Sequence, residues 1–174
     1  MSIISDNVKS LSSKEIMVIS DLEFKKKYYF KREDIEKQFT SRAQLNYTLH
    51  RLISKKRIVK LNRNKYYLVP IKARTGKWTD DAFIIADEMF DGQEYYVGGW
   101  AAANYWGFTE QIPMKIEVYT NKRNGQKKIL SVNFVFRKTT QKRIDKAVTK
   151  KLNGRSFRII GKKESKEWLK SKNF

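Results

Sequence analysis

The chain has 174 residues, 40% of them hydrophobic, which is enough for one large or two small domains with apolar cores. Its formal net charge of +20 makes a polyanion the expected partner. Because the chain has no cysteine and only one histidine, the sequence excludes disulfides, finger-type zinc sites and histidine-cluster metal sites, and we expect no cofactor.

The positive charge is concentrated at the two ends of the sequence. Residues 1–70 hold 16 lysines and arginines against 7 acidic residues, and residues 137–174 hold 14 against 3, whereas residues 71–136 are balanced at 8 each. A lysine excess that only keeps the protein in solution is the alternative, but it does not explain this partition. No apolar run approaches the roughly 20 residues that span a bilayer. The first 13 residues lack the pattern of a signal peptide, so we expect a cytoplasmic protein without membrane contact.

Three helices are expected in the first third of the chain. Ser12 and Glu15 have the spacing of a capping box, and apolar residues at helical spacing then predict a helix over 13–24. After a short extended piece, a second helix is expected over 32–39. A third helix, over 42–54, follows with almost no linker.

Two short strands with a basic turn are expected after the third helix. The segments 57–61 and 66–69 are β-type, and the polar turn Asn62-Arg63-Asn64-Lys65 joins them. Two helices in close succession and a hairpin with a basic tip form the order of a winged helix-turn-helix, a DNA-reading module. We therefore expect residues 1–70 to form a winged helix-turn-helix DNA-binding domain.

The helix expected over 42–54 has a polar face suited to a major groove. Leu45, Leu49 and Leu52 fall in one narrow stripe that should pack on the other helices. The opposite face combines side chains that can read bases, and an N-cap serine places free N–H groups near a phosphate. An ordinary solvated helix face is the alternative. The candidate DNA-binding residues are Ser41, Arg42, Ala43, Gln44, Tyr47, His50, Arg51, Lys60, Arg63, Asn64 and Lys65. Of these, we expect Gln44, Tyr47, His50 and Arg51 to read bases, and Arg42, Lys60, Arg63 and Lys65 to neutralise phosphates.

After a linker at 71–78, we expect a small mixed α/β domain over 79–174 with a basic C-terminal region, which makes the chain α+β overall. Strands at 115–120 and 130–136 should pair as an antiparallel hairpin around the loop 121–128. The other expected elements are a helix between the caps 79–81 and 91–92, a strand at 95–97, a helix at 100–106, a helix at 143–151, a strand at 156–160 and a helix at 163–170. The tail arginines and lysines would extend the contact along the duplex.

A nuclease-type or RNA-binding protein is the alternative function. Two-metal catalysis needs several carboxylates that converge on one point, but the acidic residues of the middle third are explained by helix caps and solvated faces, so we assign no catalytic residue and no metal ligand. An aromatic cluster is able to stack on the bases of single-stranded RNA, although such a short aromatic helix is more often core. Its members are Trp100, Tyr105, Trp106 and Phe108.

The chain also resembles a known family, the AbiEi-type antitoxins, which are transcriptional regulators of abortive-infection (viral defence) systems. The resemblance covers roughly residues 31–137. The segments that carry it are LISKKRIVKLNRNKYYLVP and YYVGGWAAANYWGFTEQIPMKIEVYTNKR. It implies an N-terminal domain that represses its own operon at inverted repeats, and a second domain that assists binding and neutralises a nucleotidyltransferase-like toxin. Two-fold symmetric operators would imply a homodimer.

Overall fold

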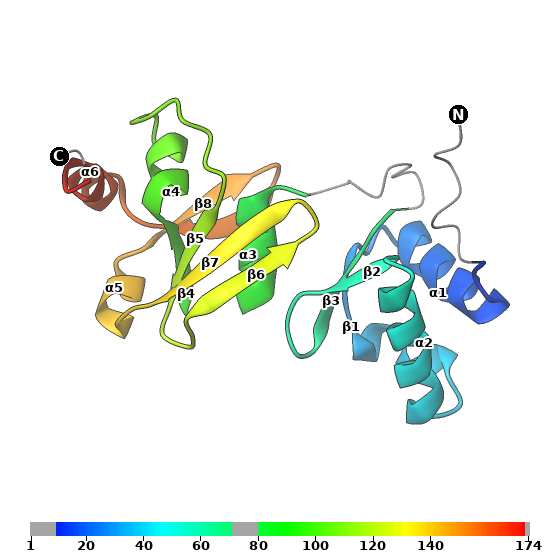
Figure 1. Cartoon of the computed structure of the whole chain (residues 1–174). Coiled ribbons are helices and arrows are strands. Elements are labelled where there is room, and N and C mark those ends of the chain that lie inside the picture. The colour runs from blue at the N-terminus through cyan, green and yellow to red at the C-terminus, as the bar shows by residue number, and fades with distance from the viewer. Residues whose placement is uncertain (1–9, 71–79, 173–174) are drawn as a thin grey trace, which may run out of the picture. The chain divides into compact units, whose positions relative to one another are not determined.

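The computed structural model describes residues 10–70 and 80–172. The chain divides into two compact units, Met1–Trp78 and Thr79–Phe174 (Figure 1). The described residues form six α-helices and two sheets, so the fold is mixed α+β. The segment 71–78, expected to be a linker, lies outside the described residues. Among the described helices, none has the length and apolar character needed to cross a membrane.

The first helix of the first unit is capped by its neighbouring side chains. α1 spans Ser13–Phe24, as predicted. The Ser12 hydroxyl accepts a hydrogen bond from Glu15 N at 3.3 Å, and Glu15 Oε2 accepts one from Ser12 N at 2.6 Å, so the capping box is confirmed. One side of α1 is apolar and buried, and its members are Val18, Ile19 and Leu22.

The segment after α1 differs from the expected second helix. Following the strand β1 (Tyr29–Lys31), the chain makes two 3₁₀ turns, η1 (Arg32–Asp34) and η2 (Glu36–Gln38), so the prediction of one helix over 32–39 was wrong. Ile35 separates the turns, because its φ of −122° is far from helical while its side chain is fully buried. In so short a segment, burial of one isoleucine outweighs a weak helical preference.

The third expected helix and the hairpin after it are present. α2 spans Arg42–Ser54, and the strands β2 (Ile58–Lys60) and β3 (Lys65–Leu68) follow. β3 is the central strand of an antiparallel sheet in the order β1-β3-β2. The helices and the sheet enclose one core, whose buried members are Val18, Ile19, Leu22, Phe30, Ile35, Leu45, Leu49, Leu52, Ile58, Tyr66 and Leu68. The predicted leucine stripe of α2 is part of this core, and burial of each leucine side chain stabilises the fold by about 1.5–3 kcal/mol.

The second unit is built on one six-stranded mixed sheet in the order β6-β7-β5-β4-β9-β8. Its strands are β4 (Tyr95–Gly98), β5 (Ile116–Thr120), β6 (Gly125–Ile129), β7 (Val132–Lys138), β8 (Val148–Leu152) and β9 (Arg155–Ile159). β5 runs parallel to β7 and β4 runs parallel to β9, while the other neighbours are antiparallel.

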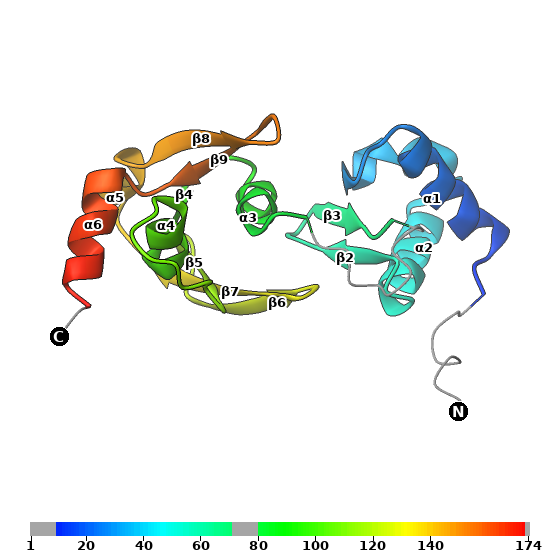
Figure 2. The same cartoon turned by 90° about the horizontal axis from the view of Figure 1, so that it is seen from above.

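Helices cover both faces of this sheet. α3 (Ala82–Phe90) lies on one face, and α4 (Gly99–Tyr105), α5 (Gln141–Asp145) and α6 (Lys162–Lys170) lie on the other (Figure 2). On the α3 side, Phe90 stacks on Tyr95 with ring centroids 5.3 Å apart. On the opposite side, Tyr96 and Tyr119 face each other from neighbouring strands and stack at 5.1 Å.

The hairpin of the second unit forms one strand later than predicted. The expected loop 121–128 is wrong, because residues Gly125–Ile129 are the strand β6, which pairs with β7. The turn lies at Leu130, whose φ is +55°, and the next residue, Ser131. β7 therefore returns between β6 and β5 and runs parallel to β5, a pairing that the local alternation of apolar residues does not reveal.

A second correction concerns the basic tail. The helix expected over 143–151 is wrong, since α5 ends at Asp145 and the strand β8 follows. β8 and β9 are joined by Asn153 and Gly154, which have φ values of 50° and 78°. Two positive φ values in a two-residue loop define a type I′ hairpin turn, for which Asn-Gly is the preferred sequence.

Gly99, the first residue of α4, is expected to be intolerant of substitution. Its φ is +62°, and an added Cβ would overlap the carboxylate of Glu117. Because the strain at this φ adds to the displacement of the Glu117 carboxylate from Arg137, we expect Gly99→Ala to lower the free energy of unfolding of the second unit by about 2 kcal/mol. Gly107→Ala is the matched control, because Gly107 has a φ of +72° but no neighbour within 4 Å of the added Cβ. Urea denaturation followed by circular dichroism measures both, and equal losses would refute the overlap.

Candidate nucleic-acid interface

α2 turns the predicted reading residues toward solvent. Ala43, Gln44 and His50 are exposed, and Tyr47 is 62% exposed, whereas the leucines on the other side are buried. Within the described parts of the chain, the side chains of Arg42 and His50 form no hydrogen bond or ion pair. These two side chains are therefore available to a ligand at the surface of α2.

The N-terminus of α2 engages two of the predicted residues in capping. The Ser41 hydroxyl accepts from Gln44 N at 3.2 Å, which confirms Ser41 as the N-cap. Gln44 Oε1 in turn accepts from both Thr40 N and Thr40 Oγ1, each at 3.2 Å. Reading adenine requires the carboxamide oxygen and the amide nitrogen together, so Gln44 would have to release Thr40 before it reads a base.

Arg51 is engaged by two partners within the unit, although its side chain is 43% exposed. Its Nε donates to Glu15 Oε1 at 3.2 Å, and its Nη1 donates to Tyr47 Oη at 3.2 Å. The guanidinium also lies 5.7 Å from the centre of the Tyr47 ring. These contacts raise the pKa of Arg51, first through the hydrogen bond to Tyr47 and then through Glu15.

Glu15 is the centre of a buried ionic cluster that joins α1 to α2. Its side chain is 1% exposed, and its Oε2 accepts from Lys55 Nζ at 2.6 Å, with the Lys55 side chain 5% exposed. Burial by itself would raise the pKa of Glu15, but the hydrogen bonds from Lys55, Ser12 and Arg51 outweigh it and lower the pKa to about 2. The capping box predicted Glu15, but nothing in the local sequence pointed to its pairing with Lys55 and Arg51.

The turn between β2 and β3 is a compact, basic tip. Asn62 Oδ1 accepts from Asn64 N at 3.0 Å and from Lys65 N at 2.9 Å, so one side chain fixes the turn. Arg63 and Asn64, at the tip, are exposed, and Lys60 is exposed on β2. Lys65 is only half-exposed, as the first residue of β3.

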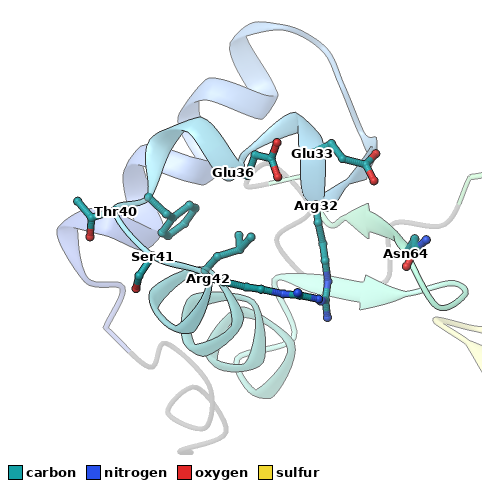
Figure 3. A pocket seen from close by; sticks show the side chains of 9 residues that line it. Arg32, Glu33, Glu36, Thr40, Ser41, Arg42 and Asn64 are labelled. Atoms are coloured by element: carbon teal, nitrogen blue, oxygen red, sulfur yellow. The ribbon is translucent and has the colours of Figure 1, made fainter.

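A cavity of about 520 Å³ lies between the 3₁₀ turns, the start of α2 and this tip. The side chains of Arg32 and Arg42 extend toward one another in it, with Asn64 of the tip on the same cavity (Figure 3). Arg32 Nε donates to Tyr66 Oη at 3.3 Å, which anchors the guanidinium over the sheet. The carboxylates of Glu33 and Glu36 also line the cavity. Arg32 was not among the predicted residues, and its only sequence signal is a basic residue at the start of the first 3₁₀ turn.

The basic tail contributes less free charge than its composition indicates. Arg155 forms ion pairs with Asp80 at 2.7 Å and with Glu88 at 2.5 Å, so it fastens β9 to the start and the side of α3. Arg158 Nη2 donates to Ile144 O at 3.0 Å. These two arginines hold the second unit together, and the remaining excess of positive charge is carried mainly by lysines.

The aromatic cluster near α4 is half-buried and is not a closed core. Trp100 contacts Trp168 edge to face at 5.5 Å, and Trp106 Nε1 donates to Ile160 O at 3.0 Å. Phe108 is half-buried beside them. Among the described residues, no group of three or more histidines and carboxylates is placed to hold a metal ion.

The chain matches no known protein-family model and no curated protein sequence.

Proposed function

We propose that this chain is a sequence-specific, double-stranded-DNA-binding transcriptional regulator. In this proposal the first unit is a winged helix-turn-helix, α2 is the recognition helix, and the β2–β3 turn is the wing. One observation carries it: Arg42 at the start of α2 and Asn64 at the tip of the turn line the same cavity together with Arg32. Two arginines at the start of α2 and in the first 3₁₀ turn, beside the amide of Asn64 at the hairpin tip, suit a phosphate backbone beside a groove, although the carboxylates of Glu33 and Glu36 line the same cavity.

The residues divide into two roles in this proposal. His50 and Tyr47, exposed on α2, contact base edges, while Arg32, Arg42 and Arg63 neutralise phosphates. Arg51 contributes chiefly by fixing the Tyr47 side chain, because it donates a hydrogen bond to the Tyr47 hydroxyl and lies over the ring. Gln44 reads a base only after its bond to Thr40 opens.

The resemblance supports a finer proposal about biological role. The chain would act in the cytoplasm as a homodimer that represses its own operon at inverted repeats. It would also neutralise a nucleotidyltransferase-like toxin. The mass of the complex with operator DNA gives the number of chains bound, and one chain per site would contradict the dimer.

Binding to the DNA upstream of its own gene tests the proposed function. Fluorescence anisotropy is measured with that duplex and with a shuffled duplex, each at two salt concentrations. We expect tighter binding to the upstream duplex, with a preference that persists at the higher salt, because base contacts do not release counterions. Equal and strongly salt-dependent binding to both duplexes would contradict sequence-specific regulation.

Arg63→Ala is expected to weaken binding to both duplexes by the same factor. Arg63 is exposed at the tip of the turn, and in this proposal it contacts a phosphate and no base edge. Removing one phosphate contact should lower the slope of log K against log salt by about 1. The same titrations measure it, and a loss confined to the upstream duplex would instead make Arg63 a base-reading residue.

A further inference from the structure

Two lysines of the second unit lie over aromatic rings at its surface. Lys150 Nζ, from β8, lies 5.2 Å from the centre of the Trp106 ring. Lys162 Nζ, from the start of α6, lies 5.9 Å from the centre of the Phe108 ring. Both rings are half-buried, so each keeps part of its surface open to solvent.

These four side chains are here called the Trp106 surface (Trp106, Phe108, Lys150 and Lys162). Trp106 is fixed by its hydrogen bond to Ile160 O, and Ile160 is two residues before Lys162. β8, which carries Lys150, is paired with β9, which ends at the residue before Ile160. The two ring–ammonium pairs are therefore neighbours across the end of β9.

The Trp106 surface is positively charged, and its cations form no ion pair with the residues that the structure describes. In the described residues, neither Lys150 nor Lys162 forms an ion pair, and the exposed lysines Lys151, Lys163 and Lys166 continue the charge along β8 and α6. Two carboxylates belong to the same segment, that of Glu164 beside Gly161 and that of Glu167, which is exposed, so the lysines remain in excess. Net positive charge at this edge of the unit favours a polyanionic ligand.

We propose that the Trp106 surface is a second nucleic-acid site, which binds single-stranded polynucleotide. A nucleotide offers a base to stack on a ring and a phosphate for an ammonium group, and here a ring and an ammonium group occur together twice. The bases of a duplex are stacked on one another and cannot reach these rings, so a single strand fits and a duplex does not. All residues of this site belong to the second unit, whereas α2 and the β2–β3 turn belong to the first.

The test uses the full chain and labelled 12-nucleotide oligouridylate and oligothymidylate, with the shuffled duplex as reference. Phe108→Leu removes a ring while keeping an apolar side chain, and it spares the hydrogen bond that Trp106 makes. We expect it to weaken single-strand binding at least 5-fold and to leave duplex binding unchanged. The double variant Lys150→Gln/Lys162→Gln should weaken single-strand binding at least 10-fold. Tighter binding of the uridylate than of the thymidylate would identify RNA as the strand recognised, and the reverse would identify DNA.

The matched control is Lys128→Gln/Lys138→Gln, which removes the same charge near β6, at the opposite edge of the sheet. We expect it to change single-strand binding less than 2-fold. An equal loss in the control, or unchanged binding in Phe108→Leu, would overturn the site. Arg63→Ala should leave single-strand binding unchanged, so a failure of this proposal is distinct from a failure of duplex recognition by the first unit.

Discussion

Replacing Glu15 with glutamine is expected to lower the free energy of unfolding of the first unit by about 3 kcal/mol at neutral pH. The carboxylate is 1% exposed and accepts hydrogen bonds from Lys55 Nζ, Arg51 Nε and Ser12 N. Glutamine would leave the ammonium group of Lys55, itself 5% exposed, without a countercharge. Breaking one half of a buried pair costs more than the pair contributes, because an uncompensated charge remains buried.

The same carboxylate predicts how the stability of the first unit depends on pH. The folded pKa of Glu15 is about 2, below its ordinary value of 4.5, so the unfolded chain binds its proton first as pH falls. The stabilisation is therefore complete above about pH 4.5 and is lost as pH falls toward 2. We expect the difference between the wild type and Glu15→Gln to shrink over this range and to be small at pH 2.

Hydrogen exchange of peptides from α1 and α2 measures this effect in the first unit alone. Lys25→Gln is the control, because it breaks an exposed ion pair with Asp21 in which the lysine side chain is 54% exposed. Such a pair contributes less than about 1 kcal/mol. If Glu15→Gln and Lys25→Gln changed the exchange of α2 equally, the buried cluster would not be what joins the two helices.

Local signals predicted the parts of the first unit that are determined locally. The capping box at Ser12 gave the start of α1, Ser41 gave the start of α2, and the leucine spacing gave the buried side of α2. The pairing of Glu15 with Lys55 joins residues 40 positions apart, and no periodicity encodes it. Burial of Ile35 is likewise a tertiary effect, which is why a helix was predicted where two 3₁₀ turns occur.

The candidate site was likewise predicted only in part, because some of its residues depend on tertiary contacts. Arg42 and Arg63 followed from their positions in a helix and a turn, and both are exposed. Arg32 was missed because its place in the cavity depends on how the 3₁₀ turns pack against α2 and β3. Arg51 was predicted as a base reader from its helical face, but the buried partner on α1 that engages it is invisible to a helical wheel.

In the second unit the errors concern strand pairing. Asn153-Gly154 is a strong local signal for a type I′ turn, and reading it would have given β8 and β9 in place of a helix. The parallel pairing of β5 with β7 had no such signal. β6 lies between these two strands in the sequence, but in the sheet it lies on the far side of β7 from β5. Parallel neighbours are set by packing of the whole sheet.

The double variant Arg32→Gln/Arg42→Gln is expected to weaken binding to the upstream duplex about 100-fold. The two guanidinium groups extend toward one another in the cavity that also reaches Asn64 (Figure 3). A phosphate shared by the two guanidinium groups would accept hydrogen bonds from both, in a cavity that the carboxylates of Glu33 and Glu36 also line, so the double variant removes two charge-assisted contacts at once. Each charge-assisted contact is worth on the order of 1.5 kcal/mol, which is about a 10-fold change in affinity.

Salt dependence separates this role from a general loss of charge. Removing two phosphate contacts should lower the slope of log K against log salt by about 2. Lys26→Gln/Lys56→Gln removes the same charge from exposed lysines beyond the C-terminal ends of α1 and α2, whereas the cavity adjoins the N-terminal end of α2. We expect this control to change affinity less than 3-fold. Equal losses in the two double variants would mean that the net charge of the unit, and not the cavity, holds the duplex; a larger loss with an unchanged slope would place the arginines on bases.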